Sequence, residues 1–271
     1  MIIDIFNNLI IHPIINVLVA IYQVLFAFHV PYALGFSIII LTVLIRLIIY
    51  PLVSTQLRAS KKMQTIAPHL SNLKEKHKGD NKRLQEETMK LYREHGVNPA
   101  AGCLPVLVQL PIIWGLYGVL NEVVKLNSVK LLEYVNNIVI SPLKLTSAWD
   151  TSFFGLHLGE SPSSLLKTVG VLVILIPVLT GVFQFVQSKM LFTAPPQTGA
   201  KKKNDDFATA FQAQSVYIFP AMIAFFSYSF PIGLSLYWNT FTVFGIIQQY
   251  KIQGLGGLEG IWQKIRKQSK E

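Results

Sequence analysis

The sequence predicts an all-α integral membrane protein with five transmembrane helices, on three grounds. Hydrophobic residues make up 51% of the 271 positions and charged residues only 14%, with a mean hydropathy of +0.44. The apolar residues gather into stretches close to the ~20 residues that a helix needs to cross a bilayer. The basic residues concentrate in alternate loops between these stretches. A soluble domain with a charged surface rarely shows this combination.

Five apolar stretches have the length of a membrane span, and they lie at 34–53, 104–124, 168–190, 214–230 and 232–250. The N-terminal segment is also apolar, but Asn, His, Pro and Gln residues interrupt it. It is therefore predicted to be an interfacial amphipathic helix. No Lys or Arg occurs before Phe28, so this segment lacks the basic region of a signal peptide.

The distribution of Lys and Arg predicts the orientation of the chain. Basic residues concentrate in 56–97, in 191–213 and in the tail, which places these segments in the cytoplasm. The loop between the second and third spans has few basic residues, largely balanced by acidic ones, and is predicted to face outward. With five spans, the N-terminus lies outside and the C-terminus in the cytoplasm. If the N-terminal segment crossed instead, the N-terminus would be cytoplasmic without a positive anchor.

The first cytoplasmic segment is predicted to be a helical hairpin. Apolar residues recur at helical spacing on both sides of Gly79-Asp80-Asn81, which has the composition of a turn. Pro68 is expected to bend the first helix, and Gly96 with Pro99 to end the second.

These observations divide the chain into ten segments. They are an interfacial helix (1–30), the first span (31–55), the hairpin (56–97), the second span (98–125), an outer loop (126–166), the third span (167–190), a cytoplasmic loop (191–213), the fourth span (214–230), the fifth span (231–251) and a basic cytoplasmic tail (252–271).

Arg46 needs an explanation because it lies inside the first predicted span, about 10 Å from its cytoplasmic end. A guanidinium there costs about 2.5–3.5 kcal/mol and keeps its proton. Apart from Glu122, near the outer end of the second span, the five spans contain no acidic residue. Arg46 is therefore predicted either to face a water-filled cavity or to extend its side chain to the cytoplasmic interface.

Thr42 and Tyr50 flank Arg46 at a spacing of one helical turn, so one stripe of this helix is polar. Polar residues of other spans are candidates to line the same concavity, and these are Gln109, Gln184, Gln187, Trp238, Asn239 and Thr240. For each Gln or Thr taken singly, interhelical hydrogen bonding is an equally good interpretation. Trp238 taken alone fits an interfacial or packing role.

Other functional classes find little support. The histidines lack metal-ligand spacing, and neither a P-loop nor a dinucleotide-binding glycine motif occurs. No metal, cofactor, nucleotide or enzymatic activity is therefore predicted. Cys103 is the only cysteine, which excludes an internal disulfide. The net charge of +10 follows from the loops and needs no nucleic-acid-binding face.

A series of motifs in this order resembles the YidC members of the Oxa/Alb superfamily of membrane protein insertases. The motifs are Thr42-Val43-Leu44-Ile45-Arg46 followed by Pro51, Gly96-Val97-Asn98-Pro99-Ala100-Ala101-Gly102-Cys103-Leu104-Pro105, Gln109 with Pro111, and Pro231-Ile232-Gly233 before Leu236-Tyr237-Trp238. Their order across nearly the whole chain is more specific than any one of them. The sequence departs from Gram-negative members in lacking a large periplasmic domain, and from many Gram-positive ones in lacking a lipoprotein signal.

The resemblance implies a hydrophilic groove that opens to the cytoplasm and to lipid, with Arg46 at its centre. The other groove residues expected are Thr42, Gln109, Gln187, Tyr237 and Trp238. The resemblance further implies a multi-pass protein of the bacterial cell membrane that works as a monomer on nascent membrane proteins among membrane lipids. The Sec translocon and the ribosome are expected as further partners, through the hairpin and the basic tail.

Two other functions stay open from the sequence. One is a small transporter or channel that binds an anion at Arg46, and the other is a passive assembly scaffold. A transporter needs no cytoplasmic hairpin and often has two related halves, so the sequence favours the insertase.

Overall fold

The computed structural model describes residues 5, 7–96, 114–115, 117–118, 128–191 and 207–268. The chain forms two compact units. The first consists of Met1–Ile48, Leu107–Gln184 and Pro220–Phe244, and the second of Ile49–Val106, Phe185–Phe219 and Gly245–Glu271.

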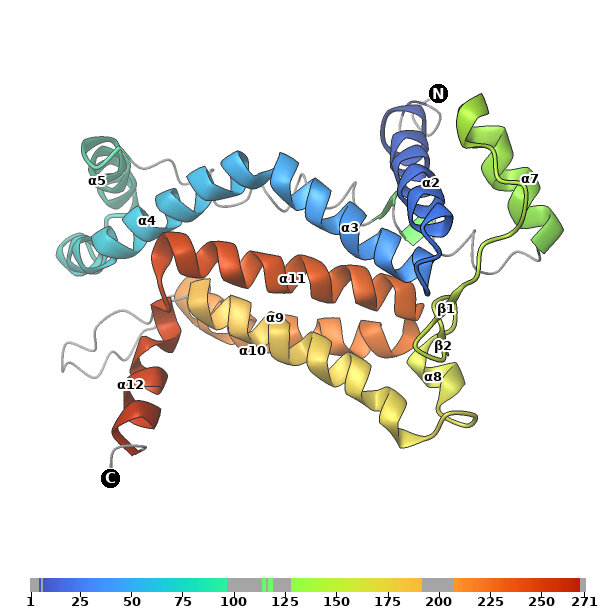
Figure 1. Cartoon of the computed structure of the whole chain (residues 1–271). Coiled ribbons are helices and arrows are strands. Elements are labelled where there is room, and N and C mark those ends of the chain that lie inside the picture. Colours follow the sequence, from blue (N-terminus) through green and yellow to red (C-terminus); the bar gives the residue numbers. More distant parts are fainter. Residues whose placement is uncertain are drawn as a thin grey trace. The chain divides into compact units, whose positions relative to one another are not determined.

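The described chain is mostly helical, as the composition predicts (Figure 1). The α-helices are α2 (His12–Ala27), α3 (Ala33–Ile48), α4 (Tyr50–Lys76), α5 (Asn81–Glu94), α7 (Ser128–Ile138), α8 (Pro162–Leu165), α9 (Leu175–Leu191), α10 (Phe207–Ser229), α11 (Ile232–Gln253) and α12 (Glu259–Gln268). Shorter helical turns are η1 (Asn7–Ile11), η3 (Ser141–Leu143), η4 (Val171–Ile174) and η5 (Gly256–Leu258). Two short strands, β1 (Ser152–Phe153) and β2 (Leu156–His157), pair antiparallel, which the sequence does not predict.

Within the described residues, two helical segments are long and apolar enough to cross a membrane, Asn7–Ala27 and Val171–Leu191. The broken pair Ala33–Ile48 and Tyr50–Leu73 adds a third if it counts as one span. Helix α11 coincides with the fifth predicted span. The second predicted span lies almost entirely outside the described residues, so the number of five spans stays a prediction.

The first predicted span is interrupted before its expected end at residue 53. Helix α3 ends at Ile48, and α4 begins at Tyr50 with Pro51 in its first turn. Pro51 has no N–H to donate to the carbonyl of Leu47, and its ring collides with that carbonyl in a continuous helix. The helical hydrogen-bond ladder therefore breaks at this position.

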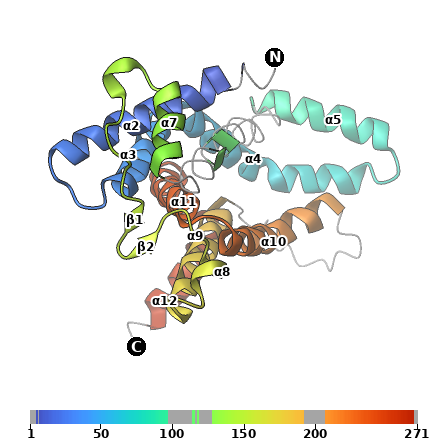
Figure 2. The ribbon, with the colours of Figure 1, turned by 90° about the vertical axis from the view of Figure 1, so that its right-hand side faces the viewer.

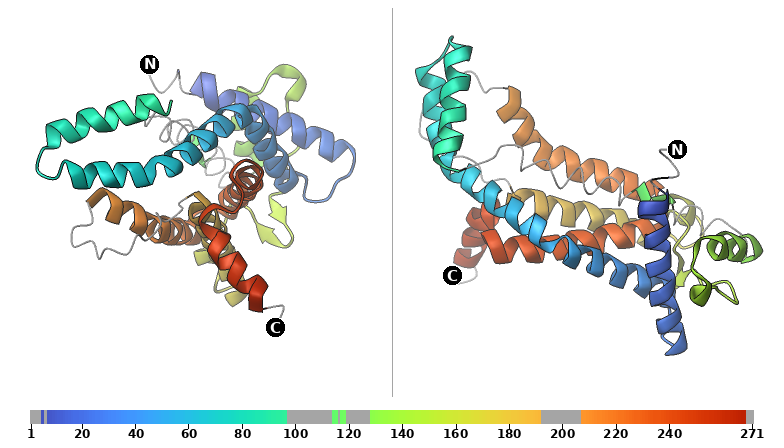
Figure 3. Two further views of the ribbon diagram at one scale, coloured as in Figure 1. Left: turned by 90° about the vertical axis from the view of Figure 1, so that its left-hand side faces the viewer. Right: turned by 90° about the horizontal axis from the view of Figure 1, so that it is seen from above.

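Helix α2 packs against α3 in the core of the first unit. Its buried residues, Ile15, Leu18, Val19 and Tyr22, follow the spacing of one helical face. Figure 3 shows α2 crossing the end of α3 instead of running along it. This segment has the length of a span, whereas the sequence predicts an interfacial helix, and its position in the membrane stays a prediction.

The segment 128–166, which the sequence predicts only as an outer loop, is folded and contributes to the same core. Leu131, Val135, Trp149 and Leu158 are buried there, and Figure 2 shows α7 beside α2. The N–H groups of Ile232 and Gly233 donate to the carbonyls of Glu160 and Leu158, at 2.8 and 2.7 Å. The first N–H groups of a helix have no hydrogen-bond acceptor within the helix, so this segment supplies the acceptors at the start of α11.

The strand β1 docks on α3 through an aromatic residue. The ring of Phe153 lies 5.6 Å from the ring of Phe36 and 6.0 Å from that of Tyr32, both edge to face. Between these two residues stands Gly35, and a Cβ atom there would overlap the Phe153 ring. A residue with no side chain is therefore required at position 35 for this contact.

The second unit contains the helical hairpin formed by α4 and α5, which lie side by side (Figure 3). Gly79 in the connecting turn has a φ of 98°, which glycine adopts without strain. Asp80 caps α5, because its carboxylate accepts a hydrogen bond from the backbone N–H of Arg83 at 3.0 Å. The turn is therefore formed by the residues from which the sequence predicts it.

Glutamine amides fasten α4 within the second unit. The Nε2 atom of Gln248 in α11 donates to the carbonyl of Tyr50 and to Ser54 Oγ, both at 3.1 Å. Gln253 donates likewise to the carbonyl of Leu57, and Gln64 of α4 donates to the carbonyl of Leu191 at 2.6 Å. These bonds fix the base of the hairpin to the ends of α11 and α9.

The substitution Gly35→Ala should destabilise the protein, because the new methyl group collides with Phe153. Overpacking of this kind costs about 1–3 kcal/mol. Thermal unfolding of the detergent-solubilised protein should show a lower Tm, and limited proteolysis should cut faster in 150–160. Gly260→Ala is the control, because no atom lies within 4 Å of a Cβ at that position. A wild-type Tm and cleavage rate for Gly35→Ala would contradict the docking of β1 on α3.

Candidate functional site

Arg46 is buried in the first unit, with 3% of its surface exposed. Its Nε and Nη2 atoms both donate to the backbone carbonyl of Phe241 in α11, at 3.0 and 2.5 Å. Its Cζ atom lies 3.3 Å from the centre of the Phe241 ring and 6.0 Å from that of the Phe244 ring. The guanidinium is thus held against α11 and does not extend into open solvent.

The α11 face that meets Arg46 is aromatic. Tyr237, Phe241 and Phe244 recur at the spacing of one helical face. Tyr237 is buried, and its ring centre lies 5.8 Å from that of Phe241. The sequence predicts Tyr237 as a site residue but misses Phe241, because a phenylalanine in an apolar span gives no polar signal.

Two other predicted site residues belong to the same unit. Thr42 is buried, and its hydroxyl donates to the carbonyl of Ile38 within α3 at 2.6 Å. Trp238 is partly buried, and its indole N–H donates to Oε1 of Gln184 at 3.3 Å. Thr42 therefore satisfies its own helix, whereas Trp238 joins α11 to α9.

The remaining two predicted site residues lie outside the described part of the first unit. Gln187 is partly buried and belongs to the second unit. Gln109 lies outside the described residues. The groove that these residues were expected to line together therefore stays a prediction.

A chain of buried hydroxyl groups joins three helices of the first unit. Thr180 Oγ1 of α9 lies 3.2 Å from Ser227 Oγ of α10, which lies 2.9 Å from Ser235 Oγ of α11. Thr180 also donates to the carbonyl of Ile176, which completes its hydrogen bonding within α9. These residues give no distinctive signal in the sequence, since serine and threonine are common in membrane helices.

The electrostatics of the site favour an anion. The helices α3 and α9 to α11 contain no acidic residue, and the two hydrogen bonds that Arg46 makes within the described residues end on one neutral oxygen. The edge of a guanidinium that carries Nε and Nη2 can bind a carboxylate through two parallel hydrogen bonds. Arg46 therefore presents to α11 the edge that a carboxylate would use.

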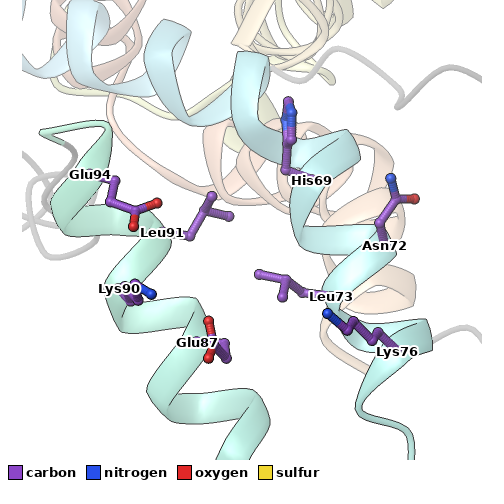
Figure 4. A pocket seen from close by; sticks show the side chains of 8 residues that line it. All are labelled: His69, Asn72, Leu73, Lys76, Glu87, Lys90, Leu91 and Glu94. Carbon is purple, nitrogen blue, oxygen red and sulfur yellow. The ribbon is translucent and has the colours of Figure 1, made fainter.

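A shallow pocket of about 330 Å³ lies between the two helices of the hairpin (Figure 4). Leu73 and Leu91 point toward one another from the two helices, and charged residues of both signs surround them. This mixture selects no ligand by charge. Among the residues that the structure describes, no three His, Cys, Asp or Glu side chains gather as a metal site would require.

Comparison with known proteins gives one consistent family. The model of the family described as "60Kd inner membrane protein" matches residues 25–256. The membrane protein insertase YidC of Fusobacterium nucleatum is 36% identical over 222 residues, which cover 82% of this chain and 87% of that protein. The membrane protein insertase MisCA of Bacillus subtilis is 34% identical over 224 residues, covering 81% of this chain and 70% of MisCA.

The likeness extends to a chloroplast protein and to a solved structure. The inner membrane protein ALBINO3 of Arabidopsis thaliana is 35% identical over 238 residues, covering 85% of this chain and 49% of ALBINO3. A crystal structure of an active YidC insertase with its first transmembrane domain resolved is similar with a TM-score of 0.52 and 26% identity. The match covers 85% of this chain and 46% of the solved chain.

Replacing the central hydroxyl of the buried chain, Ser227→Ala, should destabilise the first unit. Hydrogen bonds of this kind within membrane helices contribute about 0.6 kcal/mol on average and up to about 1.7 kcal/mol. The Tm of the solubilised protein should fall slightly, whereas Ser229→Ala at the exposed end of α10 should leave it unchanged. Equal effects of the two substitutions would argue against a structural role for the hydroxyl chain.

Proposed function

Because the chain belongs to the YidC/Oxa/Alb family of membrane protein insertases, we propose that it helps other integral membrane proteins to enter the bilayer and fold there. The observation that carries this proposal is Arg46, a buried cation whose hydrogen bonds to the described residues end on a neutral carbonyl. A permanent charge at this depth is expensive, and residues of this kind mark functional sites in membrane proteins.

In the proposed mechanism, Arg46 binds acidic residues on the hydrophilic segment of a substrate. A hydrophilic groove on the cytoplasmic side shortens the hydrocarbon path that this segment must cross, with Thr42, Gln109, Gln187, Tyr237 and Trp238 along its wall. The free-energy barrier to crossing the membrane falls because the segment moves from water to a surface of polar groups and one fixed charge, and does not have to enter lipid.

The energy for insertion comes from the substrate and from the membrane. Each centrally placed Leu, Ile, Phe or Val of a substrate span gains about 0.3–0.6 kcal/mol on entering the bilayer. An acidic segment that moves outward gains about 2.3 kcal/mol per charge for every 100 mV of membrane potential. The proposed mechanism therefore consumes no nucleotide.

The partners follow from the same mechanism. The hairpin of α4 and α5 receives the incoming segment in the cytoplasm, and the protein works as a monomer in a bacterial cell membrane with its C-terminus inside. Helix α12 carries Lys264, Arg266 and Lys267, and its charge suits contact with ribosomal RNA at the site of synthesis. The Sec translocon is a further proposed partner.

The substitution Arg46→Ala should reduce insertion of a single-span substrate with an acidic tail by about tenfold or more, because a hydrogen bond to a charged group contributes about 1.5–3 kcal/mol. Arg46→Lys should retain much of the activity if charge alone matters. The assay is protease protection of the substrate in liposomes that contain the reconstituted protein, with release of a trapped small anion measured in parallel.

Lys167→Ala, which removes a basic residue that is exposed in the structure, is the matched control. Normal insertion of several acidic-tailed substrates by Arg46→Ala would refute the role given to Arg46. Anion flux that depends on Arg46, without insertion, would identify a transporter instead. A lack of both activities would leave the scaffold function.

Deleting 259–271 should weaken co-sedimentation with ribosomes. Added salt should weaken the co-sedimentation of the full chain. Each phosphate contact that is lost lowers the dependence of binding on salt concentration. Replacing Lys264, Arg266 and Lys267 by Gln in the full chain separates the charge from the length of the tail. Unchanged co-sedimentation at every salt concentration would rule out the tail as a ribosome contact.

A further inference from the structure

Phe241 contacts Arg46 in two independent ways. Its backbone carbonyl accepts from both Nε and Nη2, and the face of its ring lies 3.3 Å from Cζ. The carbonyl occupies one edge of the guanidinium, and the ring covers one face. A single residue of α11 therefore determines both the position and the orientation of the charged group.

The two contacts differ in how a substrate would affect them. A carbonyl oxygen is neutral, so a carboxylate that reaches the Nε and Nη2 edge forms shorter and stronger hydrogen bonds than the carbonyl does. The attraction between a cation and the face of an aromatic ring does not use that edge, and it strengthens where water is excluded. The ring contact can therefore persist while the carbonyl is exchanged for a carboxylate.

We propose that Phe241 is a positioning residue for Arg46. Its ring holds the guanidinium in place, and its carbonyl occupies the carboxylate-binding edge until an acidic group of the substrate replaces it. This inference rests on the proposed insertase function and adds to it a specificity for acidic segments that depends on the aromatic ring.

The neighbouring aromatic residues have lesser roles in this proposal. The ring of Phe244 lies 6.0 Å from Cζ of Arg46, at the limit of such an interaction. Tyr237 packs beside the ring of Phe241 and supports it from the preceding turn. A matched control is Phe225 of α10, which is exposed and lies outside the aromatic face that meets Arg46.

The test compares Phe241→Leu with wild-type protein in the liposome assay, using one substrate with an acidic tail and a second whose acidic residues are replaced by Asn or Gln. Loss of the ring should lower insertion of the acidic substrate by about twofold to thirtyfold and leave that of the neutral substrate unchanged. Phe241→Tyr and Phe241→Trp keep an aromatic face and should retain activity, and Phe225→Leu should behave as wild type. In an Arg46→Lys background, Phe241→Leu should have a smaller effect, because an ammonium group lacks the flat face that stacks on a ring.

The contact itself is measured without substrate. In protein labelled with ¹⁵N-arginine and placed in lipid nanodiscs, the Nε–H resonance of Arg46 is assigned by its loss in Arg46→Lys. The ring should shift this resonance, and Phe241→Leu should abolish that shift. If the Arg46 Nε–H resonance of Phe241→Leu is the same as that of the wild type, the proposal is overturned, whether or not the variant has lost insertion activity.

Equal losses for the acidic and neutral substrates, or an undiminished effect in the Arg46→Lys background, would mean that Phe241 is only structural and would overturn the proposal. Normal activity of Phe241→Leu, with Arg46→Ala still defective, would overturn it and leave the proposed function intact. Normal insertion by Arg46→Ala would instead refute the role proposed for Arg46 in insertion, whereas the Nε–H shift would still report the contact.

Discussion

The buried guanidinium of Arg46 constrains the packing of α3 against α11. A charge that cannot be neutralised needs an acceptor wherever water is excluded, and these two helices supply no carboxylate. The carbonyl and the ring of Phe241 meet that need in the first unit. In the proposed mechanism this acceptor, being neutral, gives way to an anionic group of the substrate, which binds the charge more strongly.

Unsatisfied backbone groups impose the second constraint. Within lipid, every N–H and carbonyl group needs a partner from the protein. The segment 128–166 supplies carbonyls to the first N–H groups of α11, and Gln248 donates to the carbonyl of Tyr50 close to the break at Pro51. The places where helices begin or break are therefore the places where other parts of the same unit make polar contacts.

Polar side chains inside the helices serve two purposes that the sequence does not separate. Thr180, Ser227 and Ser235 bond to one another and join three helices, and Trp238 bonds to Gln184. Thr42, which the resemblance places near the groove, is satisfied by the carbonyl of Ile38. Hydrogen bonds within and between helices thus account for these polar residues. From the sequence alone, a hydrated surface would explain them equally well.

The sequence by itself determined the helical class and the hairpin with its turn at Gly79 and Asp80, and it singled out Arg46 as a charge that needs a partner. These depend on local signals, namely apolar periodicity, turn-forming residues and the cost of a charge among apolar neighbours. Only the tertiary structure decided that Phe241 is the partner of Arg46, that the ring of Phe153 covers Gly35, and that the segment 128–166 belongs to the core. These contacts join residues far apart in the chain through apolar side chains and backbone carbonyls, which every helix contains and no composition distinguishes.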